Sequence, residues 1–493
     1  MNGGSVSPGN SPGVVTVGED LEFVDSEYRT ELYRDGEADH IMAKTISFDA
    51  DSSVVISSRD GFLLDTPYRI MQAEETITLD AGTDIGFDRQ YLFLNDPAGT
   101  ITADCVDGDG ECYDVTITRN GVTFDDDSIV RTDNQHNVAE AIAGLDDSDA
   151  IVASMLLSED EADARARLDN LSGDTHSTQL GTFITQTQIM NDAVGSRVNG
   201  AFAAGGVSGG GGADLGVLSS AGARYGGWAR TYGEWAELDD DGTASAVDSR
   251  IAGVMLGFDV ASESSLVGLA AGFASSSADA EDFDSTSDAD TLHVLAYGAH
   301  RFGALRLSGG AGYGWASIDT ERRPAGDRLT ASYDAEIANL FGEVAYETGL
   351  GGFAVEPFAG LAYTHVDADG FTETGGAGAL TSDGADFDGL SSTLGVRFAH
   401  AFTTGDGVVV RPNGMLGWRH AYGDLTPDRV MTFSGTGADF IAEGLPIARD
   451  SLVLTAGVEF GLNENLTVGL DYRGSFASEA TSNAVNLTGR LEF

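Results

Sequence analysis

The chain has 493 residues, and its 26 Lys plus Arg stand against 79 Asp plus Glu, giving a net charge of −53. Only Lys44 is a lysine, which argues against a nucleic-acid partner, because neutralising phosphates needs a basic surface. Mean hydropathy is −0.08 and no run of 18 apolar residues occurs, so a helical membrane protein is excluded. The 66 glycines and 42% hydrophobic residues instead leave a transmembrane β-barrel or a soluble β-solenoid.

The first 131 residues carry short β-rich segments separated by Gly, Asp and Asn. These segments are VVTV, TISF, SVVISS, TITL and YDVTITR, at 14–17, 45–48, 53–58, 76–79 and 113–119. Short strands at such even spacing are typical of a sandwich or of a stacked solenoid.

The two cysteines, Cys105 and Cys112, flank the sequence VDGDGE. The Gly-Asp-Gly turn favours a hairpin disulfide in an oxidising compartment, and a pair of free thiols is the alternative. Asp104, Asp107, Asp109 and Glu111 could offer oxygen ligands to calcium, but the full twelve-residue loop with its closing Glu is missing. A solvated turn is therefore favoured, and we expect no metal and no cofactor.

From about Asn134 the apolar residues follow a helical period, and Gly173 is a typical helix C-cap. A second helical stretch, 178–198, is rich in Thr, Gln and Ser and carries only a sparse apolar set. The residues singled out in this helix are Phe183, Ile184, Ile189, Asn191 and Val194. Such a helix lacks a broad face for a dry core and suits a wet, confined channel. A Gly-rich tether, 203–213, follows it.

From about residue 226 the period is two, most clearly in 466–476 and 484–493. Twelve such segments are predicted as strands: 226–237, 249–259, 266–276, 290–299, 305–316, 331–347, 353–365, 391–400, 408–422, 451–460, 466–476 and 484–493. The connections alternate between short turns and long loops, which favours an outer-membrane barrel over a sandwich.

Charged residues occupy alternate positions of these strands, where they can line a water-filled lumen. They are Arg397, Arg411, Arg419, Glu459, Asp471, Arg473, Arg490 and Glu492. Several of them are expected to contact the 178–198 helix, and Arg411 and Arg419 are the pair chosen to test this. The alternative is that the charges pair only with one another across the lumen.

Acidic clusters recur in the predicted long loops, at Asp239–Asp241, Asp279–Asp290 and Asp383–Asp388. They are read either as solvated surface or as carboxylates that divalent cations bridge to lipopolysaccharide phosphates. No catalytic motif is seen, and Ser172-Gly173-Asp174 is interpreted as a helix end. The histidines are scattered, with His400 and His420 expected at the membrane interface.

Four features resemble the C-terminal part of a type V autotransporter of Gram-negative bacteria. They are the opening GGSVSPGNSPG, the segment TDNQHNVAEAIAGL with LSGDTHS, the stretch GGWARTYGEW, and the terminal strand VNLTGRLEF. Val485, Leu487, Leu491 and Phe493 of that strand resemble the signal read by the barrel-assembly machinery. The resemblance implies an all-β fold: a 12-stranded antiparallel transmembrane β-barrel with an α-helical linker in its lumen, preceded by a short β-helix.

The resemblance also implies three parts: 1–135 as the end of a β-helical passenger, 136–213 as the helical linker, and 214–493 as the barrel. The implied function is export and surface anchoring of the passenger through the outer membrane, without enzyme activity. A barrel enzyme (a surface protease or esterase) and an adhesin acting through the β-helix are the alternatives. Implied partners are outer-membrane lipid, lipopolysaccharide, the assembly machinery and periplasmic chaperones, with a monomeric barrel.

Two features depart from that family pattern. Met1 opens a segment without the basic and apolar regions of a signal peptide, so a signal and further passenger are expected upstream. Some family members cut their own linker at paired asparagines, whereas this helix has Asn191-Asp192, so self-cleavage is not expected.

Overall fold

The computed structural model describes residues 1–493 except 10–11, 107–108, 204–223, 281–284, 406, 464 and 493. The chain divides into two compact units. The N-terminal unit comprises Met1–Leu171 with Gly435–Ala438, and the barrel unit comprises Ser172–Ser434 with Asp439–Phe493. The linker expected at 136–213 is therefore divided between the two units, with 136–171 in the first and 172–203 in the second. Its Gly-rich tether, from 204 onward, lies outside the described residues.

The N-terminal unit is built from short strands that stack in parallel. Its strands are β1 (Asn2–Val6), β2 (Val14–Thr16), β3 (Leu21–Glu31), β4 (His40–Ala43), β5 (Ile46–Phe48), β6 (Ser53–Ser57), β7 (Pro67–Ala73), β8 (Ile77–Leu79), β9 (Asp84–Phe87), β10 (Ala98–Val106) and β11 (Asp109–Thr116). Glu27 pairs with Ser53, and Ser53 pairs with Asp84, in successive parallel ladders. Parallel pairing once per coil is the arrangement of a β-solenoid, the second of the two sequence readings.

An aromatic interior and an antiparallel hairpin complete these coils. The rings of Phe23 and Phe48, which lie on paired strands, stack with centroids 4.1 Å apart. The hairpin β10–β11 joins the sheet at β7, and a disulfide links Cys105 to Cys112 within it.

Within the part of the chain that the structure describes, four α-helices follow the last of these strands. They are α1 (Asp133–Ala143), α2 (Ala150–Leu156), α3 (Glu161–Ser172) and α4 (Asp174–Ala203). Gly173, with φ +69°, separates α3 from α4 in a left-handed conformation that favours glycine. The 30 residues of α4 give it a length of about 45 Å, longer than the predicted 178–198. No described helix combines the length and the apolarity that crossing a membrane requires.

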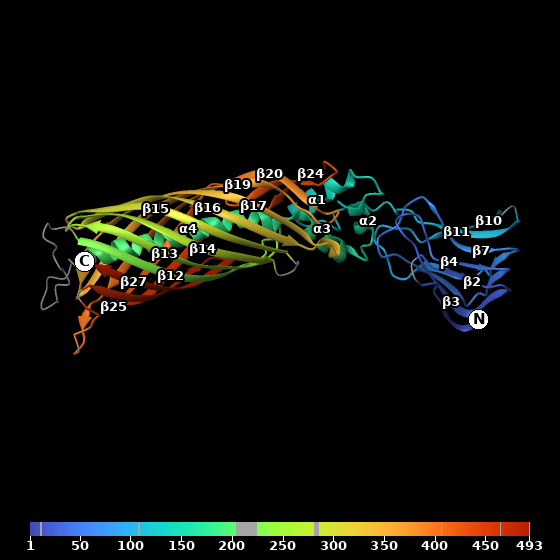
Figure 1. The fold of residues 1–493 in the computed structure, drawn as a ribbon, viewed down its shortest axis with the longest axis horizontal. Coiled ribbons are helices and arrows are strands. Elements are labelled where there is room, and N and C mark those ends of the chain that lie inside the picture. Colours follow the sequence, from blue (N-terminus) through green and yellow to red (C-terminus); the bar gives the residue numbers. More distant parts are fainter. Residues whose placement is uncertain are drawn as a thin grey trace. The chain divides into compact units, whose positions relative to one another are not determined.

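Within the described residues, twelve long strands close into one antiparallel barrel, as predicted. They are β12 (Arg224–Leu238), β13 (Val247–Ala261), β14 (Ser265–Ala280), β15 (Ser285–Phe302), β16 (Leu305–Arg322), β17 (Leu329–Tyr346), β19 (Phe353–Thr372), β20 (Leu380–Ala399), β22 (Val409–Tyr422), β25 (Asp450–Gly461), β26 (Leu466–Phe476) and β27 (Ala480–Glu492). The first and last, β12 and β27, pair along their length, and α4 lies inside the barrel (Figure 1).

Shorter elements extend the barrel wall. They are η1 (Pro324–Gly326), β18 (Thr348–Leu350), β21 (Phe402–Thr403), β23 (Asp428–Phe433) and β24 (Asp439–Glu443). The hairpin β23–β24 continues from β20 at the end of the barrel that carries the long connections.

The barrel strands run further than the sequence predicts. The prediction of a loop over Asp279–Asp290 is wrong for most of its length, because β14 extends to Ala280 and β15 begins at Ser285. The acidic segment Asp383–Asp388 likewise lies within β20. The outward residues in these outer segments of β14, β15 and β20 are mostly Asp, Ser and Thr. The strands therefore continue there without the alternation of apolar and polar residues that predicts a strand.

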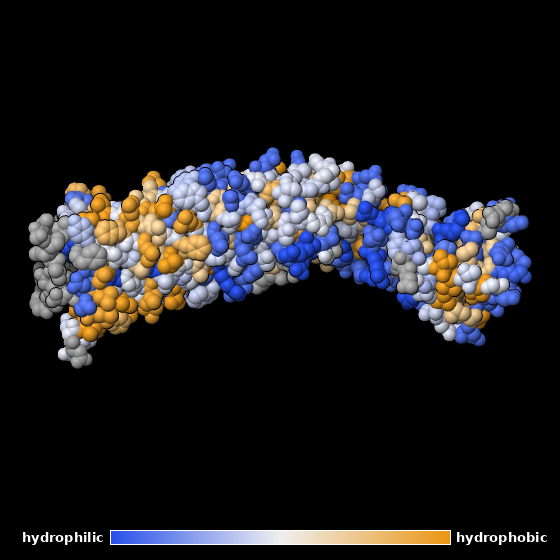
Figure 2. Space-filling model, viewed as in Figure 1, coloured by the Kyte–Doolittle hydropathy of each residue, from blue (hydrophilic) through white to orange (hydrophobic). Residues whose placement is uncertain are grey.

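Apolar side chains cover only one part of the barrel exterior. On β14 the outward residues Leu269 and Phe273 are exposed, whereas further toward the long connections the outward positions are Ser275, Ser277 and Asp279. Figure 2 shows the hydrophobic residues gathered over the barrel end near the C-terminus. The bilayer therefore surrounds the short-turn end, and the long-connection end extends beyond it.

Candidate functional site: a helix held in the barrel lumen

The helix α4 buries polar side chains against the polar inner wall of the barrel. Thr175, His176, Ser177, Thr178 and Gln179 are all nearly inaccessible to solvent. Buried polar groups are tolerated only when they are hydrogen-bonded, so each of these side chains needs a partner on the strands.

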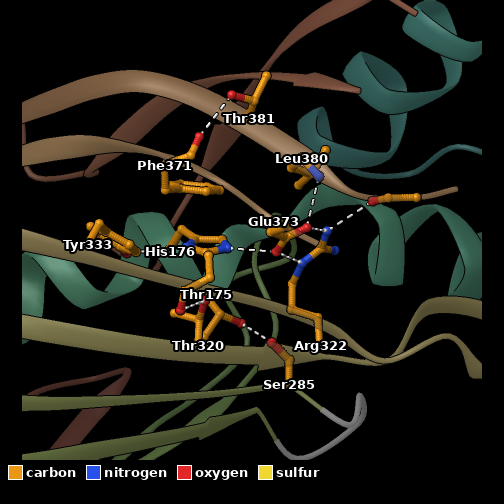
Figure 3. Close-up of polar contacts among 12 residues, drawn as sticks. Thr175, His176, Ser285, Thr320, Arg322, Tyr333, Phe371, Glu373, Leu380 and Thr381 are labelled. Carbon is orange, nitrogen blue, oxygen red and sulfur yellow. Dashed lines mark hydrogen bonds and ion pairs between the residues drawn. The ribbon is translucent and has the colours of Figure 1, made fainter. Parts of the chain in front are cut away.

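His176 occupies the centre of a buried cluster at the long-connection end of the barrel (Figure 3). Its Nε2 lies 3.0 Å from Oε1 of Glu373, and its Nδ1 lies 3.2 Å from the Tyr333 hydroxyl. The imidazole also stacks on the ring of Phe371 at 4.1 Å between centroids. These partners fit a neutral imidazole that donates from Nε2–H to the carboxylate and accepts from Tyr333 at Nδ1.

Arg322 holds the carboxylate of Glu373 from the other side. Its Nε donates to Oε1 at 2.7 Å and its Nη2 donates to Oε2 at 2.6 Å, while the Leu380 backbone N–H donates to Oε2 at 2.9 Å. Burial opposes the charge of Glu373, but the Arg322 guanidinium outweighs it and holds the pKa of that carboxyl below its ordinary value. The cluster of His176, Glu373, Arg322, Tyr333 and Phe371 is called the outer clamp below.

Hydroxyl groups extend the outer clamp along the first turn of α4. Thr175 Oγ1 lies 2.8 Å from Ser285 Oγ, and Ser177 Oγ donates to the Ala442 carbonyl at 2.7 Å. Thr178 Oγ1 accepts from the Leu445 backbone N–H at 3.0 Å. Each partner lies at or beyond the long-connection end of a strand, so α4 begins at that mouth of the barrel.

Polar contacts continue along the middle of the helix. Asn339 Nδ2 donates to Asn191 Oδ1 at 2.8 Å, and Arg473 forms an ion pair with Asp192 at 3.0 Å. Arg419 reaches the same carboxylate at 3.9 Å and also donates to Gln188. The strands thus present both amide and cationic partners to this stretch of α4.

An ion pair fixes the last turns of α4 at the short-turn end. Arg197 donates from Nε and Nη2 to the two carboxylate oxygens of Asp259, at 2.7 and 2.6 Å. Asp259 also accepts from the Tyr297 hydroxyl at 2.9 Å, and Glu492 lies 3.6 Å from Arg197. Both ends and the centre of the helix are therefore tied to the wall.

A cavity of about 280 Å³ lies beside α4 in the lumen. Six of the eight strand charges proposed from the sequence border it: Arg397, Arg411, Arg419, Glu459, Asp471 and Arg473. Asn191 of the helix also borders it, whereas Phe183, Ile184, Ile189 and Val194 are buried against the wall.

The strand charges divide between the helix and one another. Arg419, Arg473 and Glu492 contact α4 as given above. The remaining pairs lie between strands: Arg397 with Glu343 and Glu356, Arg411 and Arg490 with Glu459, and Asp471 with Arg230. Of the two arginines predicted to contact the helix, Arg419 contacts α4, whereas Arg411 pairs with Glu459 of a neighbouring strand.

Sequence reasoning did not single out the outer clamp or the Arg197–Asp259 pair. The available signal was the run Thr175–Gln179, whose side chains are all polar although it lies next to an apolar helix pattern. Nothing in the spacing of Arg322 or Glu373 links either residue to His176, since 197 positions separate His176 from Glu373.

The terminal strand closes the barrel. Val485, Leu487 and Leu491 of β27 are exposed on the outer face, and Phe493 lies outside the described residues. Among the described residues, no group of three His, Cys, Asp or Glu side chains is arranged to hold a metal ion.

Comparison with known proteins identifies relatives by sequence and by structure. Two extracellular serine proteases of Serratia marcescens are each 28% identical to this chain over 98% and 97% of its length, and it covers 49% of each. The chain thus spans about half the length of these relatives.

Solved structures also resemble the barrel. The translocator domain of autotransporter NalP from Neisseria meningitidis is 12% identical, with a TM-score of 0.49 over 64% of this chain and 98% of that one. The β domain of the Bordetella autotransporter Brka is 20% identical, with a TM-score of 0.42 over 55% and 100%. The family model for the autotransporter beta-domain matches residues 227–473, half of the chain. The chain belongs to the autotransporter β-domain family.

Proposed function

We propose that the barrel exports the chain segment that precedes α4 and afterwards anchors it at the bacterial surface. The barrel is an outer-membrane protein, as its family and its apolar belt indicate. The observation that carries the proposal is α4 itself: a segment of the same chain is tied to the lumen wall at both ends. In a channel for external solutes, a helix fixed inside the lumen would obstruct the passage of the solute.

The direction of α4 gives the direction of export. Its first residues contact the long connections, and its last residues contact Asp259 and Glu492 near the short-turn end. Long connections face the exterior in outer-membrane barrels, so the chain preceding α4 leaves through the outer mouth. The N-terminal unit is therefore the cargo that this barrel displays.

The Serratia relatives are named as serine proteases, and this chain matches half of each. We infer that the matched half supplies export rather than proteolysis, because its most elaborate polar arrangement, the outer clamp, is buried and holds a helix of the same chain. Outer-membrane lipid, lipopolysaccharide, the barrel-assembly machinery and periplasmic chaperones are the partners that this function requires.

Surface display tests the proposal directly. The full chain, expressed behind a secretory signal in a Gram-negative host and tagged in its N-terminal unit, should be labelled by antibody on intact cells. Added protease should remove the tag while the barrel persists. A tag that stays protected on intact cells, although the barrel is folded and resists denaturation in detergent, would contradict export through this pore.

A further inference from the structure

A hydroxyl, an imidazole and a carboxylate lie side by side on the outer wall of the barrel. In the strand registers Ser392 of β20 pairs with His420 of β22, and His420 pairs with Asp450 of β25. All three share the outward face, because Leu394, Trp418 and Leu452, two positions along each strand, are exposed. The three side chains therefore stand in one row across three adjacent strands.

The imidazole is oriented by the carboxylate. His420 Nδ1 lies 2.8 Å from Asp450 Oδ1, and the Trp418 indole N–H donates to the same oxygen at 2.9 Å. A carboxylate that accepts from Nδ1–H leaves the lone pair on Nε2, at the opposite side of the ring. His420 is thereby held as a base whose free nitrogen points away from β25.

The hydroxyl has a second polar neighbour. Ser392 Oγ lies 2.9 Å from the hydroxyl of Tyr422, which follows His420 by two residues on the same face. Directly paired residues have Cβ atoms about 4.5–5.5 Å apart, so a rotation of the serine side chain brings Oγ toward the imidazole. Catalytic hydrogen bonds of this kind often form only when substrate is bound.

The row lies at a boundary of the barrel surface. Toward the short turns the outward residues are Leu394, Leu416 and Leu452, each about half exposed. Toward the long connections Leu390 is followed by Asp388 on β20. The boundary between apolar and charged outward residues is the level at which lipid acyl chains join their headgroups.

We propose that Ser392, His420 and Asp450 form an esterase site on the lipid-facing wall, acting on acyl esters of membrane amphiphiles. Ser392 Oγ attacks the ester carbonyl carbon and passes its proton to His420 Nε2. The bond from that carbon to the alcohol oxygen breaks, and His420 returns the proton to the leaving alcohol. Water then attacks the acyl-serine carbonyl carbon and passes a proton to His420. The bond from that carbon to Ser392 Oγ breaks, and His420 returns the proton to Oγ, which leaves the carboxylic acid and free Ser392.

Each neighbour has a defined part in this reaction. The Tyr422 hydroxyl, next to Oγ, is placed to donate to the oxyanion that forms at the attacked carbonyl. Asp450 is a positioning residue that acts through His420. The acyl chain of the ester lies against Leu394 and Leu416, within the apolar belt.

A second imidazole–carboxylate pair on the same wall supplies a matched control. His365 Nδ1 lies 2.9 Å from Asp388 Oδ1, and Tyr363 donates to the same carboxylate at 2.7 Å. The residue opposite His365 on β17 is Ala338, so this pair has no hydroxyl across the strand. It reproduces the interfacial His–Asp geometry without a nucleophile.

The full chain, folded in phospholipid vesicles, should hydrolyse p-nitrophenyl octanoate faster than empty vesicles do. Ser392→Ala and His420→Ala should each lower that rate by at least about 100-fold. His365→Ala should leave it unchanged. Asp450→Asn should lower kcat with little change in KM, since Asp450 does not touch substrate. An alkyl fluorophosphonate should phosphonylate Ser392 with loss of HF, and so add the mass of the phosphonyl group to the peptide that contains Ser392.

Two results would overturn the proposal. One is hydrolysis by the folded wild-type barrel no faster than by empty vesicles. The other is hydrolysis that persists in Ser392→Ala, which would assign the reaction to another group. Mobility of unheated samples on detergent gels shows that each variant retains the closed barrel, so loss of folding is separated from loss of chemistry.

Discussion

The outer clamp is expected to hold the first turns of α4, and replacing Arg322 by methionine tests this. The guanidinium and the Glu373 carboxylate are each at most 3% exposed and share two hydrogen bonds. Removing one partner of a buried ion pair leaves an uncompensated charge, which costs about 3–5 kcal/mol. Because about 1.4 kcal/mol is tenfold in an equilibrium constant, opening of this turn should become at least 100-fold more frequent.

Hydrogen–deuterium exchange of the peptide covering residues 174–182, with the barrel in lipid vesicles, measures that opening. Arg322→Met should accelerate its exchange by about two to four powers of ten. Arg323→Met is the matched control, because Arg323 is half exposed and pairs at the surface with Glu321. The control should change exchange less than about fivefold.

The double variant Arg322→Met/Glu373→Gln separates an orphaned charge from lost packing. With both charges removed, the amide still offers His176 an acceptor, so the double variant should exchange more slowly than Arg322→Met alone. Exchange in Arg322→Met that matches wild type would refute the clamp. A double variant that loses as much protection as the two single changes together would refute the reasoning about the uncompensated charge.

Three further outcomes are expected. Since the pKa of Glu373 lies below its ordinary 4.5 in the folded barrel, its stabilising contribution is present above that pH and is lost as the pH falls below it. Exchange protection of residues 174–182, corrected for intrinsic rates, should therefore decrease below about pH 4.5 more steeply in wild type than in Glu373→Gln, which retains only the loss caused by His176, whose pKa burial also lowers. Gly173→Ala should lower stability against urea by more than about 1 kcal/mol, because φ is +69° and a Cβ would lie 2.5 Å from a Leu380 methyl carbon; Gly195→Ala, where no atom lies within 4 Å, should not. Arg473→Ala should raise single-channel conductance more than Arg411→Ala does, because only Arg473 holds α4, and equal changes would contradict that assignment.

The strand number was predictable because lipid and water impose opposite requirements on alternate residues. Inside the bilayer β26 and β27 carry apolar residues outward and charged residues inward, so a period of two is visible in the sequence. Above the bilayer the outward face of β15 is wet, and its inner face is small or polar and buried against α4, so neither face carries the large apolar residues that would reveal a period of two. That is why the strands were counted correctly while their outer ends, and the hairpin β23–β24, were predicted as loops.

The helix in the lumen was predictable from what it lacks, since 178–198 has no broad apolar face. The strand residues that contact the helix were not predictable. All lumen-facing residues share one periodicity, and only their height along the barrel determines which of them contacts α4. Arg411 and Arg473 have the same sequence pattern, yet β22 places one beside Glu459 and β26 places the other beside Asp192.

The row on the outer wall depends on register in the same way. Ser392 and His420 are 28 residues apart, and no fixed-spacing motif contains both. A shift of β22 by one residue would pair Ser392 with an inward residue, and a shift by two would pair it with Trp418 or Tyr422. Because turns and bilayer together fix the register, the same constraint that closes the barrel decides whether a hydroxyl, a base and a carboxylate stand in line.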